Sequence, residues 1–261
     1  MFDNQGFIYR GSLAPGRIYT RTTNGNCYLE SGKFYKDQRI NLSKADIDNP
    51  GVAMIAYVGG NGSVETGNSS YRGLAIALRD CNPYNSSTGK DYFYGPDWCT
   101  QTSATCTSGY NSQYNTDVTV ARGWKNGISM TSDLILDTDG HNHWAAKAAS
   151  TYNVTHPSNT SGWFLASLGQ WQLILQGLVT KVDNLSQLYS ASISGQANPK
   201  MTYDHLDSVL ENAGTYLSDC YWSSSEYDAS ESWFVAPSNG TASHFTKKSN
   251  QHDVRAVLAF E

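Results

Sequence analysis

The C-terminal part of the chain begins with Tyr221-Trp222-Ser223-Ser224-Ser225-Glu226 and ends with Val254-Arg255-Ala256-Val257-Leu258-Ala259-Phe260. Trp222 is predicted to be a large core side chain, because a bulky apolar ring in a strand pattern is rarely left exposed. The closing segment alternates in the way that is typical of a half-buried strand. We therefore expect both segments to belong to the structural framework of the fold.

Between these two segments the sequence predicts a β-hairpin with strands at 232–236 and 241–246. Ser238-Asn239-Gly240 supplies the turn, since glycine tolerates positive φ. Alternation along a strand places Trp233 and Val235 on one face, which we expect to be framework. The opposite face is expected to be free for display, and with the proposed turn it carries Phe234, Ala236, Thr241 and Ser243.

Composition limits the class of protein and of partner. The chain has 261 residues, of which only 16% are charged, and its formal net charge is -5. The acidic balance and the lack of a basic run argue against nucleic acid as a partner. No apolar stretch is long enough to span a bilayer, so direct membrane insertion is not expected.

Periodicity predicts strands and helices in one domain. Residues 51–58 and 74–78 are apolar runs typical of strands that are buried on both faces. Helices are predicted at 143–152, at 168–182 and from Thr202 to Ala213, and Ser167 with Gln170 forms a capping box before the second. This pattern predicts an α+β fold with short antiparallel strands. We place the main domain at 48–261, and we interpret 1–47 as a β appendage or attachment segment.

The order of these elements resembles a bacterial branch of the C-type lectin-like superfamily. The resemblance covers about residues 48–261 and rests on the buried strand, Gly162-Trp163-Phe164-Leu165-Ala166, the 221–226 segment, Ser232-Trp233-Phe234-Val235 and the terminal strand. Some members of that branch are variable proteins of diversity-generating retroelements, in which the C-terminal coding segment is rewritten. The resemblance implies a C-type lectin-like fold and a variable segment at about 221–253.

The resemblance implies a non-enzymatic protein that binds a protein or glycan ligand and needs no cofactor. Aromatic, Ser and Asn side chains give contact area and adaptable hydrogen bonds, as in antibody loops. An invariant surface or fimbria-associated adhesin of the same fold is the alternative. We expect an extracellular protein, as a cell-surface or virion component. The start of the chain lacks a secretory signal pattern, so either a signal has been removed or the protein leaves its cell by another route, such as assembly into a virus particle. The candidate ligand-binding residues are Asp228, Ser230, Glu231, Phe234, Ala236, Ser238, Thr241, Ser243, His244, Thr246, Ser249, Gln251 and His252.

Other chemistries have weaker support in the sequence. Asp137, Asp139, His141 and His143 alternate in one segment, as metal ligands do, but Asp-x-Asp-Gly before a helix is more often a turn and an N-cap. The Glu-Pro-Asn, Gln-Pro-Asp and Trp-Asn-Asp triplets of calcium-dependent lectins are missing. The sequence also has no nucleophile elbow, no His-Glu-x-x-His and no phosphate loop. An enzyme on this scaffold is therefore the least favoured hypothesis.

The cysteines leave their redox state open. The chain has 5 of them, at spacings that match no metal or redox motif, so at least one lacks an intrachain partner. A disulfide between Cys99 and Cys106 is one alternative. Burial as small apolar side chains is the more common fate of scattered cysteines, and it is the one we expect for Cys220.

Overall fold

The computed structural model describes residues 7–9, 18–21, 27–29, 53–77, 79–81, 84–85, 90–91, 95–99, 115–136, 142–154, 156, 160–178, 220–238, 240–246 and 251–261. The predicted helix from Thr202 to Ala213 lies outside these residues. So do Asp137, Asp139 and His141, and so does Cys106. Fully buried Cys99 is described.

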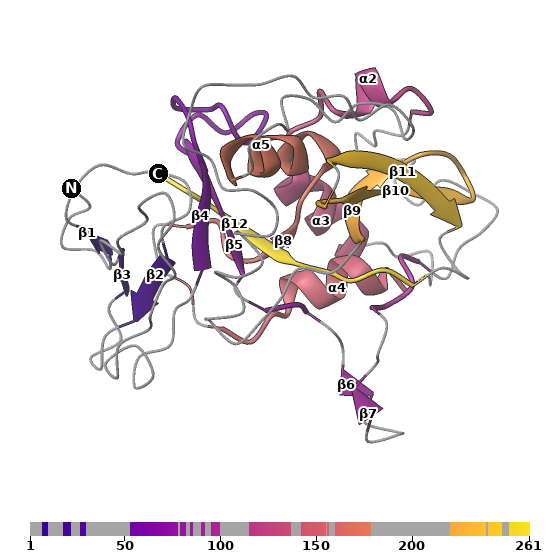
Figure 1. Ribbon diagram of the computed structural model, residues 1–261, viewed down its shortest axis with the longest axis horizontal. Coiled ribbons are helices and arrows are strands. Elements are labelled where there is room, and N and C mark those ends of the chain that lie inside the picture. The colour runs from indigo at the N-terminus through magenta and orange to yellow at the C-terminus, as the bar shows by residue number, and fades with distance from the viewer. Residues whose placement is uncertain are drawn as a thin grey trace.

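The described helices and strands form an α+β structure, as expected (Figure 1). The largest sheet has the strand order β1-β3-β2-β4-β5-β12-β8, a second has the order β11-β10-β9, and β6 pairs with β7. The strands are β1 (Phe7–Tyr9), β2 (Ile18–Arg21), β3 (Cys27–Leu29), β4 (Ala53–Val58), β5 (Gly73–Ala77), β6 (Tyr84–Asn85), β7 (Lys90–Asp91), β8 (Phe164–Leu165), β9 (Tyr221–Glu226), β10 (Glu231–Ala236), β11 (Thr241–Thr246) and β12 (Ala256–Phe260). The helices are α2 (Val118–Ala121), α3 (Gly127–Leu136), α4 (Trp144–Ser150) and α5 (Leu168–Leu178).

The N-terminal strands add to the edge of the same sheet as the main domain. Strand β2 pairs antiparallel with β4, with Ile18 opposite Met54. The boundary that we place at residue 48 stays a prediction.

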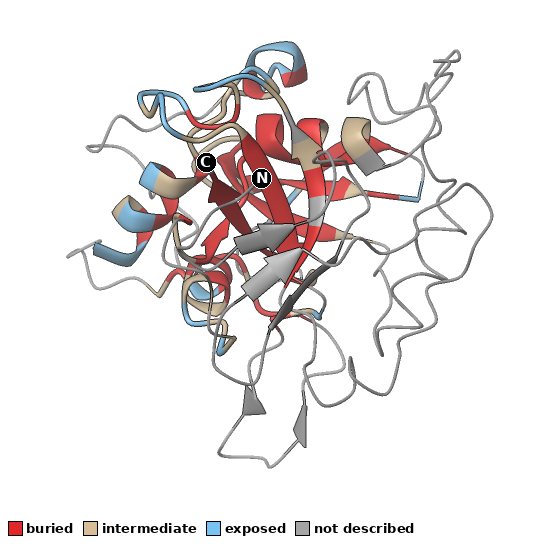
Figure 2. Cartoon of the chain, turned by 90° about the vertical axis from the view of Figure 1, so that its left-hand side faces the viewer, coloured by how far each residue is buried: buried red, intermediate tan, exposed pale blue. Residues whose placement is uncertain are grey.

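The centre of the large sheet is buried on both faces, as expected for β4 and β5. Strand β12 pairs with β5 on one side, Val257 opposite Ile76, and with β8 on the other, Ala256 opposite Leu165. The expectation of a half-buried closing strand is wrong, because every residue of β12 is buried. Figure 2 shows these central strands in the buried colour.

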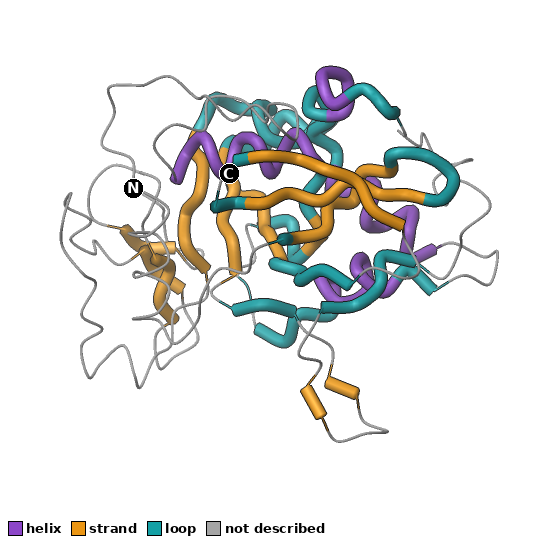
Figure 3. The backbone as a smooth tube through the Cα atoms, turned by 45° about the vertical axis from the view of Figure 1, so that its right-hand side comes forward, coloured by secondary structure: helices purple, strands orange, loops and turns teal. Residues whose placement is uncertain are grey.

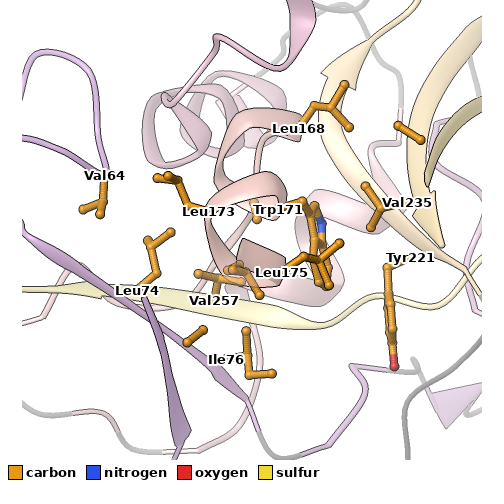
Figure 4. Packing of buried hydrophobic residues seen from close by; sticks show 14 of the residues in the cluster. Val64, Leu74, Ile76, Leu168, Trp171, Leu173, Leu175, Tyr221, Val235 and Val257 are labelled. Atoms are coloured by element: carbon orange, nitrogen blue, oxygen red, sulfur yellow. The ribbon is translucent and has the colours of Figure 1, made fainter. Parts of the chain in front are cut away.

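Helices on opposite faces of the sheet explain this burial. Alternate side chains of β12 enter two different apolar clusters: Val257 and Ala259 pack on the α5 side, whereas Leu258 and Phe260 pack on the α4 side. In Figure 1, α5 lies above and α4 below the strands β12 and β8. The α5 cluster appears close up in Figure 4, where Trp171 and Leu175 lie between Val257 and Val235. A central strand between two helical layers has no solvent face.

The start of α5 is fixed by three polar groups. The Ser167 backbone N–H donates to Gln170 Oε1 at 3.0 Å, which is one half of the predicted capping box. The other half differs, because the Ser167 hydroxyl donates to the Trp124 carbonyl at 2.7 Å. The Leu168 N–H instead donates to the hydroxyl of Ser225 in β9, at 3.0 Å. A residue from the C-terminal segment therefore caps this helix.

A buried carboxylate holds the start of α3. Glu65 lies in the β4–β5 connection with 4% exposure and accepts from Gln170 Nε2 at 2.7 Å and from the Ile128 and Ser129 backbone N–H groups at 3.4 Å each. Burial raises its pKa to about 7, and the hydrogen bonds oppose that rise. The connection, α3 and α5 are thereby joined at one polar point.

A second buried charged group is Arg255, which pairs with Asp80. Its Nε lies 2.8 Å from Asp80 Oδ1, and its Nη2 donates to the Tyr221 hydroxyl at 2.9 Å. The guanidinium is fully buried, so its charge requires this partner.

No helix within the described part of the chain has the length and apolar character needed to cross a membrane.

Candidate ligand-binding site

The predicted hairpin is present with the predicted register. Phe234 pairs with Ser243 and Ala236 pairs with Thr241, so these four side chains share one face of the β10–β11 pair. Gly240 has a φ of 67°, and its N–H donates to the Ala236 carbonyl at 2.9 Å. The turn therefore uses glycine in the left-handed region, as the sequence indicated. Figure 3 shows the long orange strands of this sheet beside the purple helices.

The expectation that this face is exposed is wrong. Phe234 is 6% exposed, Thr241 is 6% exposed and Ser243 is 7% exposed. The Phe234 ring meets Trp222 edge-on at 6.4 Å and belongs to the apolar cluster on the α4 side of the sheet. This face is covered because it packs on the core, just as the Trp233 face does.

The expectation of one continuous patch is also wrong. His244 pairs with Trp233, which places it on the face opposite Phe234. Ala236 and the exposed Ser238 lie at the turn end of the hairpin. Five residue steps separate Ala236 from Glu231, which is about 17 Å along a strand. A single small ligand does not reach both ends.

Half-exposed side chains gather instead at the end of the sheet away from the hairpin turn. We call this region the open end. Its members lie on the β9–β10 turn, at the start of β10 and near the end of β11, and four of them are predicted site residues. They are Tyr227, Asp228, Ser230, Glu231 and His244.

Asp228 organises the turn at the open end. Its Oδ1 accepts from the Ser230 N–H at 2.7 Å, the Ser230 hydroxyl at 3.0 Å and the Glu231 N–H at 2.9 Å. The backbone closes the same turn, since the Tyr227 N–H donates to the Glu231 carbonyl at 3.1 Å. Asp side chains favour such turns because they satisfy nearby backbone donors. The turn thus fixes the backbone positions from which the Tyr227 and Glu231 side chains extend.

The side chains of the open end are held against one another. His244 Nδ1 lies 2.6 Å from Glu231 Oε2, and the His244 ring stacks on Tyr227 with centroids 3.7 Å apart and planes at 8°. Trp233 lies edge-on to both, at 5.1 Å from Tyr227 and 5.7 Å from His244. The Trp233 indole N–H donates to the Asn115 carbonyl at 3.0 Å. A buried tryptophan therefore forms the floor beneath a stacked Tyr–His pair.

Phe245 is an exposed aromatic residue that the sequence interpretation missed. It is 42% exposed and stacks on Phe234 with centroids 5.1 Å apart. It lies on the face opposite His244, because it pairs with Ser232. Its exposure could have been predicted from the sequence, because Phe245 lies next to the end of β11 and is soon followed by Lys247-Lys248.

Of the remaining predicted site residues, His252 and Gln251 are described, and they do not belong to the open end. His252 packs its ring against Trp222 at 4.5 Å and Phe234 at 4.4 Å, and burial lowers its pKa to about 4. Gln251 is exposed, and its backbone forms an isolated antiparallel β-bridge with Asp97. The side chain of Thr246 and all of Ser249 lie outside what the structure describes. Ligand binding by any of these residues stays a prediction.

The described residues bring together no group of three or more His, Cys, Asp or Glu side chains that could hold a metal ion. His143 is the one described member of the alternating Asp/His segment. It is 1% exposed, precedes α4 and meets the Trp98 ring edge-on. His143 therefore packs as a core residue.

The comparisons with known proteins give one distant structural likeness. The chain is similar to a fimbrial protein from Bacteroides ovatus ATCC 8483, with a TM-score of 0.49 and 17% sequence identity, over 95% of this chain and 49% of that chain. It spans about half the length of that protein. At this score and identity, the likeness carries no argument about function. No family model matches the sequence, and none of the curated proteins matches it.

Proposed function

We propose that this chain is a non-enzymatic recognition module that binds a ligand outside the cell through the open end of the β9–β10–β11 sheet. The observation that carries the proposal is the contrast within the β9–β10–β11 sheet. Its central side chains are buried framework, whereas Tyr227, Glu231 and His244 are partly exposed and held in a fixed mutual geometry. Binding surfaces gain affinity when their side chains are ordered before the ligand arrives.

The buried framework of the β9–β10–β11 sheet supports this division of roles. The Trp222 indole N–H donates to the Pro96 carbonyl at 2.9 Å, and the Trp171 indole N–H donates to the Trp222 carbonyl at 3.3 Å. Each bond ties a buried ring to the backbone of another segment. The open-end side chains take no part in these bonds, although Tyr227 packs against the same apolar cluster as Trp171.

We further propose a C-type lectin-like scaffold. Support comes from the order of its elements, in which a buried strand, a capped helix, the Trp222 strand, the hairpin and the terminal strand follow one another as the resemblance requires. The rewriting of the C-terminal coding segment is part of the same proposal. Finding a reverse transcriptase gene and a near-copy of that segment beside the gene would support it. An isolated gene would favour an invariant adhesin.

Screening the purified protein against arrays of surface proteins and glycans tests the function. We expect a Tyr227→Ala, Glu231→Ala double variant to lose binding to whichever array members retain the wild-type protein. Ser238→Ala, at the far end of the hairpin, is the matched control and should bind as the wild type does. Equal binding by the double variant would refute a role for the open end.

A further inference from the structure

The imidazole of His252 lies among three aromatic rings, which we call the cage. The centroid of the His252 ring is 4.5 Å from that of Trp222, 4.4 Å from that of Phe234 and 5.4 Å from that of Phe245. These rings come from β9, β10 and β11, so each strand of the sheet contributes one. Phe234 therefore owes part of its burial to the His252 ring.

The cage offers no hydrogen bond to the imidazole. His252 Nε2 is buried, and it has no hydrogen-bond partner among the described residues. The same holds for Oδ1 of the adjacent Asp253. A polar atom buried in this way has lost its hydrogen bond to water, and it regains that bond when the segment opens. Opening would thus return two polar atoms to water.

Residues 251–253 are held more loosely than the strand that follows them. The Asp253 N–H donates to the Cys220 carbonyl at 3.1 Å, and its carbonyl accepts from the Trp222 N–H at 3.0 Å. The segment is nevertheless exposed or partly exposed, whereas every residue of 254–260 is buried. Local opening is easiest where few side chains are buried. The boundary between a segment that can open and the fixed terminal strand therefore falls after Asp253.

We propose that His252 is an acid-operated latch, in which protonation of the imidazole releases residues 251–253 from the sheet and uncovers Phe234 and Phe245, while β12 stays in place. An imidazolium carries an N–H on each ring nitrogen, and each N–H needs an acceptor. The cage has no acceptor for Nε2, so the charged ring is better solvated outside it.

The three rings of the cage are uncharged. The charged groups on neighbouring segments are Asp97, which pairs with the residue before His252, Asp253, which follows it, and the pair of Asp80 with Arg255. Burial lowers the pKa of His252 from 6.5 to about 4. The contribution of neutral His252 to the closed state is therefore complete above pH 6.5 and is lost as pH falls through 4.

Hydrogen exchange of the wild-type protein tests local opening without any substitution. From pH 7 to pH 4.5, the protection factor of the Asp253 amide should fall at least roughly tenfold, because the open segment takes up the proton more readily. The amide of Ile76, in the central strand β5, should keep a higher protection factor throughout. Equal protection factors for both amides at every pH would mean that the segment opens only with the whole domain, which would overturn the proposal.

His252→Phe keeps an aromatic ring in the cage and removes the group that takes up the proton. The acid-dependent loss of protection at the Asp253 amide should disappear in this variant. Asp80, Asp97 and Asp253 all remain, so a pH dependence that persists would belong to them and would refute the latch. His156→Gln is the matched control, since it removes another half-buried imidazole, and it should respond to acid as the wild type does.

The uncovered rings are detected with 8-anilinonaphthalene-1-sulfonate, a dye that fluoresces on exposed apolar surface. In the wild type its fluorescence should rise as pH falls from 6 to 4 while the Ile76 amide stays protected, and it should fall again when pH 7 is restored. His252→Phe should lack this rise. The same dye response in both proteins would show that His252 does not control exposure of this surface.

Discussion

Single aromatic residues of the C-terminal segment have different roles although they lie close together in sequence. Trp222 and Trp233 are buried, and each indole N–H ends on a backbone carbonyl of a distant segment. Phe234 packs on Trp222 inside, and Phe245 covers Phe234 from outside. The exposed member of this stack is the residue that can be removed at least cost to the fold.

We expect Phe234→Ala to destabilise the protein by about 3–5 kcal/mol, the range for an emptied aromatic core site. Phe245→Ala should cost about 1 kcal/mol or less, because much of its ring is in water. Urea denaturation of both variants is the measurement. Equal losses, or a larger loss for Phe245→Ala, would show that the burial assigned to these rings is wrong.

At the scale of elements, α5 begins where β9 supplies a hydroxyl. Ser225 Oγ accepts from the Leu168 N–H across 57 residues of sequence. The hydroxyl of Ser224, its neighbour in β9, makes a long contact of 3.8 Å to Met130 Sδ. The two serines are both fully buried, so they form a matched pair for substitution.

Ser225→Ala should lower the free energy of unfolding by about 1–2 kcal/mol, because it leaves a buried helix N–H without its acceptor. Ser224→Ala is expected to lower it by less. Hydrogen exchange at Leu168 should accelerate in the first variant alone. A larger effect of Ser224→Ala would contradict the assignment of Ser225 as the cap.

The elements that could be predicted are those set by local pattern. The apolar runs predicted β4 and β5. Alternation together with a turn glycine predicted the hairpin and its register. Ser167 and Gln170 predicted the start of α5. Alternation assigns residues to two faces but does not say which face another segment covers. The burial of Phe234 depends on Trp222 and His252, and the cap of α5 depends on Ser225. Both are long-range contacts that no local pattern contains.

The candidate site could be predicted in part for the same reason. Asp228, Ser230, Glu231 and His244 were expected to be site residues, and they do come together, since turn and register bring them to one end of the sheet. Phe245 was missed. Tyr227 was missed too, although its place before Asp228 at the end of β9 was a usable signal. The stack that joins it to His244 follows only from the tertiary arrangement.

At the scale of the whole molecule, two buried groups with shifted pKa values act on stability in opposite directions. Glu65 has its pKa raised from 4.5 to about 7, so the folded state holds that proton more tightly than the unfolded state. Its stability contribution is complete below pH 4.5 and is lost as pH rises through 7. His252 has its pKa lowered from 6.5 to about 4, so its contribution is present above pH 6.5 and is lost as pH falls through 4.

Glu65→Gln should therefore become more stable relative to the wild type as pH rises from 4.5 to 8, by up to ~3 kcal/mol, from 1.36 kcal/mol per pKa unit. The measurement is chemical denaturation of both proteins across this range. His252→Phe is the complementary variant, and its stability relative to the wild type should rise as pH falls from 6.5 to 4. If the difference in unfolding free energy between Glu65→Gln and the wild type did not change with pH, Glu65 would not be a group whose pKa is raised by folding.

The central claim, that the open end is the binding surface, is tested most directly by titration calorimetry. The titrant is a partner recovered from the protein and glycan arrays, and the proteins are wild type, Tyr227→Ala with Glu231→Ala, and Ser238→Ala. We predict that the double variant keeps the wild-type melting temperature within a few degrees and loses at least about tenfold in affinity, as expected when central contact residues are truncated. Ser238→Ala should match the wild type. Unchanged affinity in the double variant, or a loss confined to Ser238→Ala, would contradict the account.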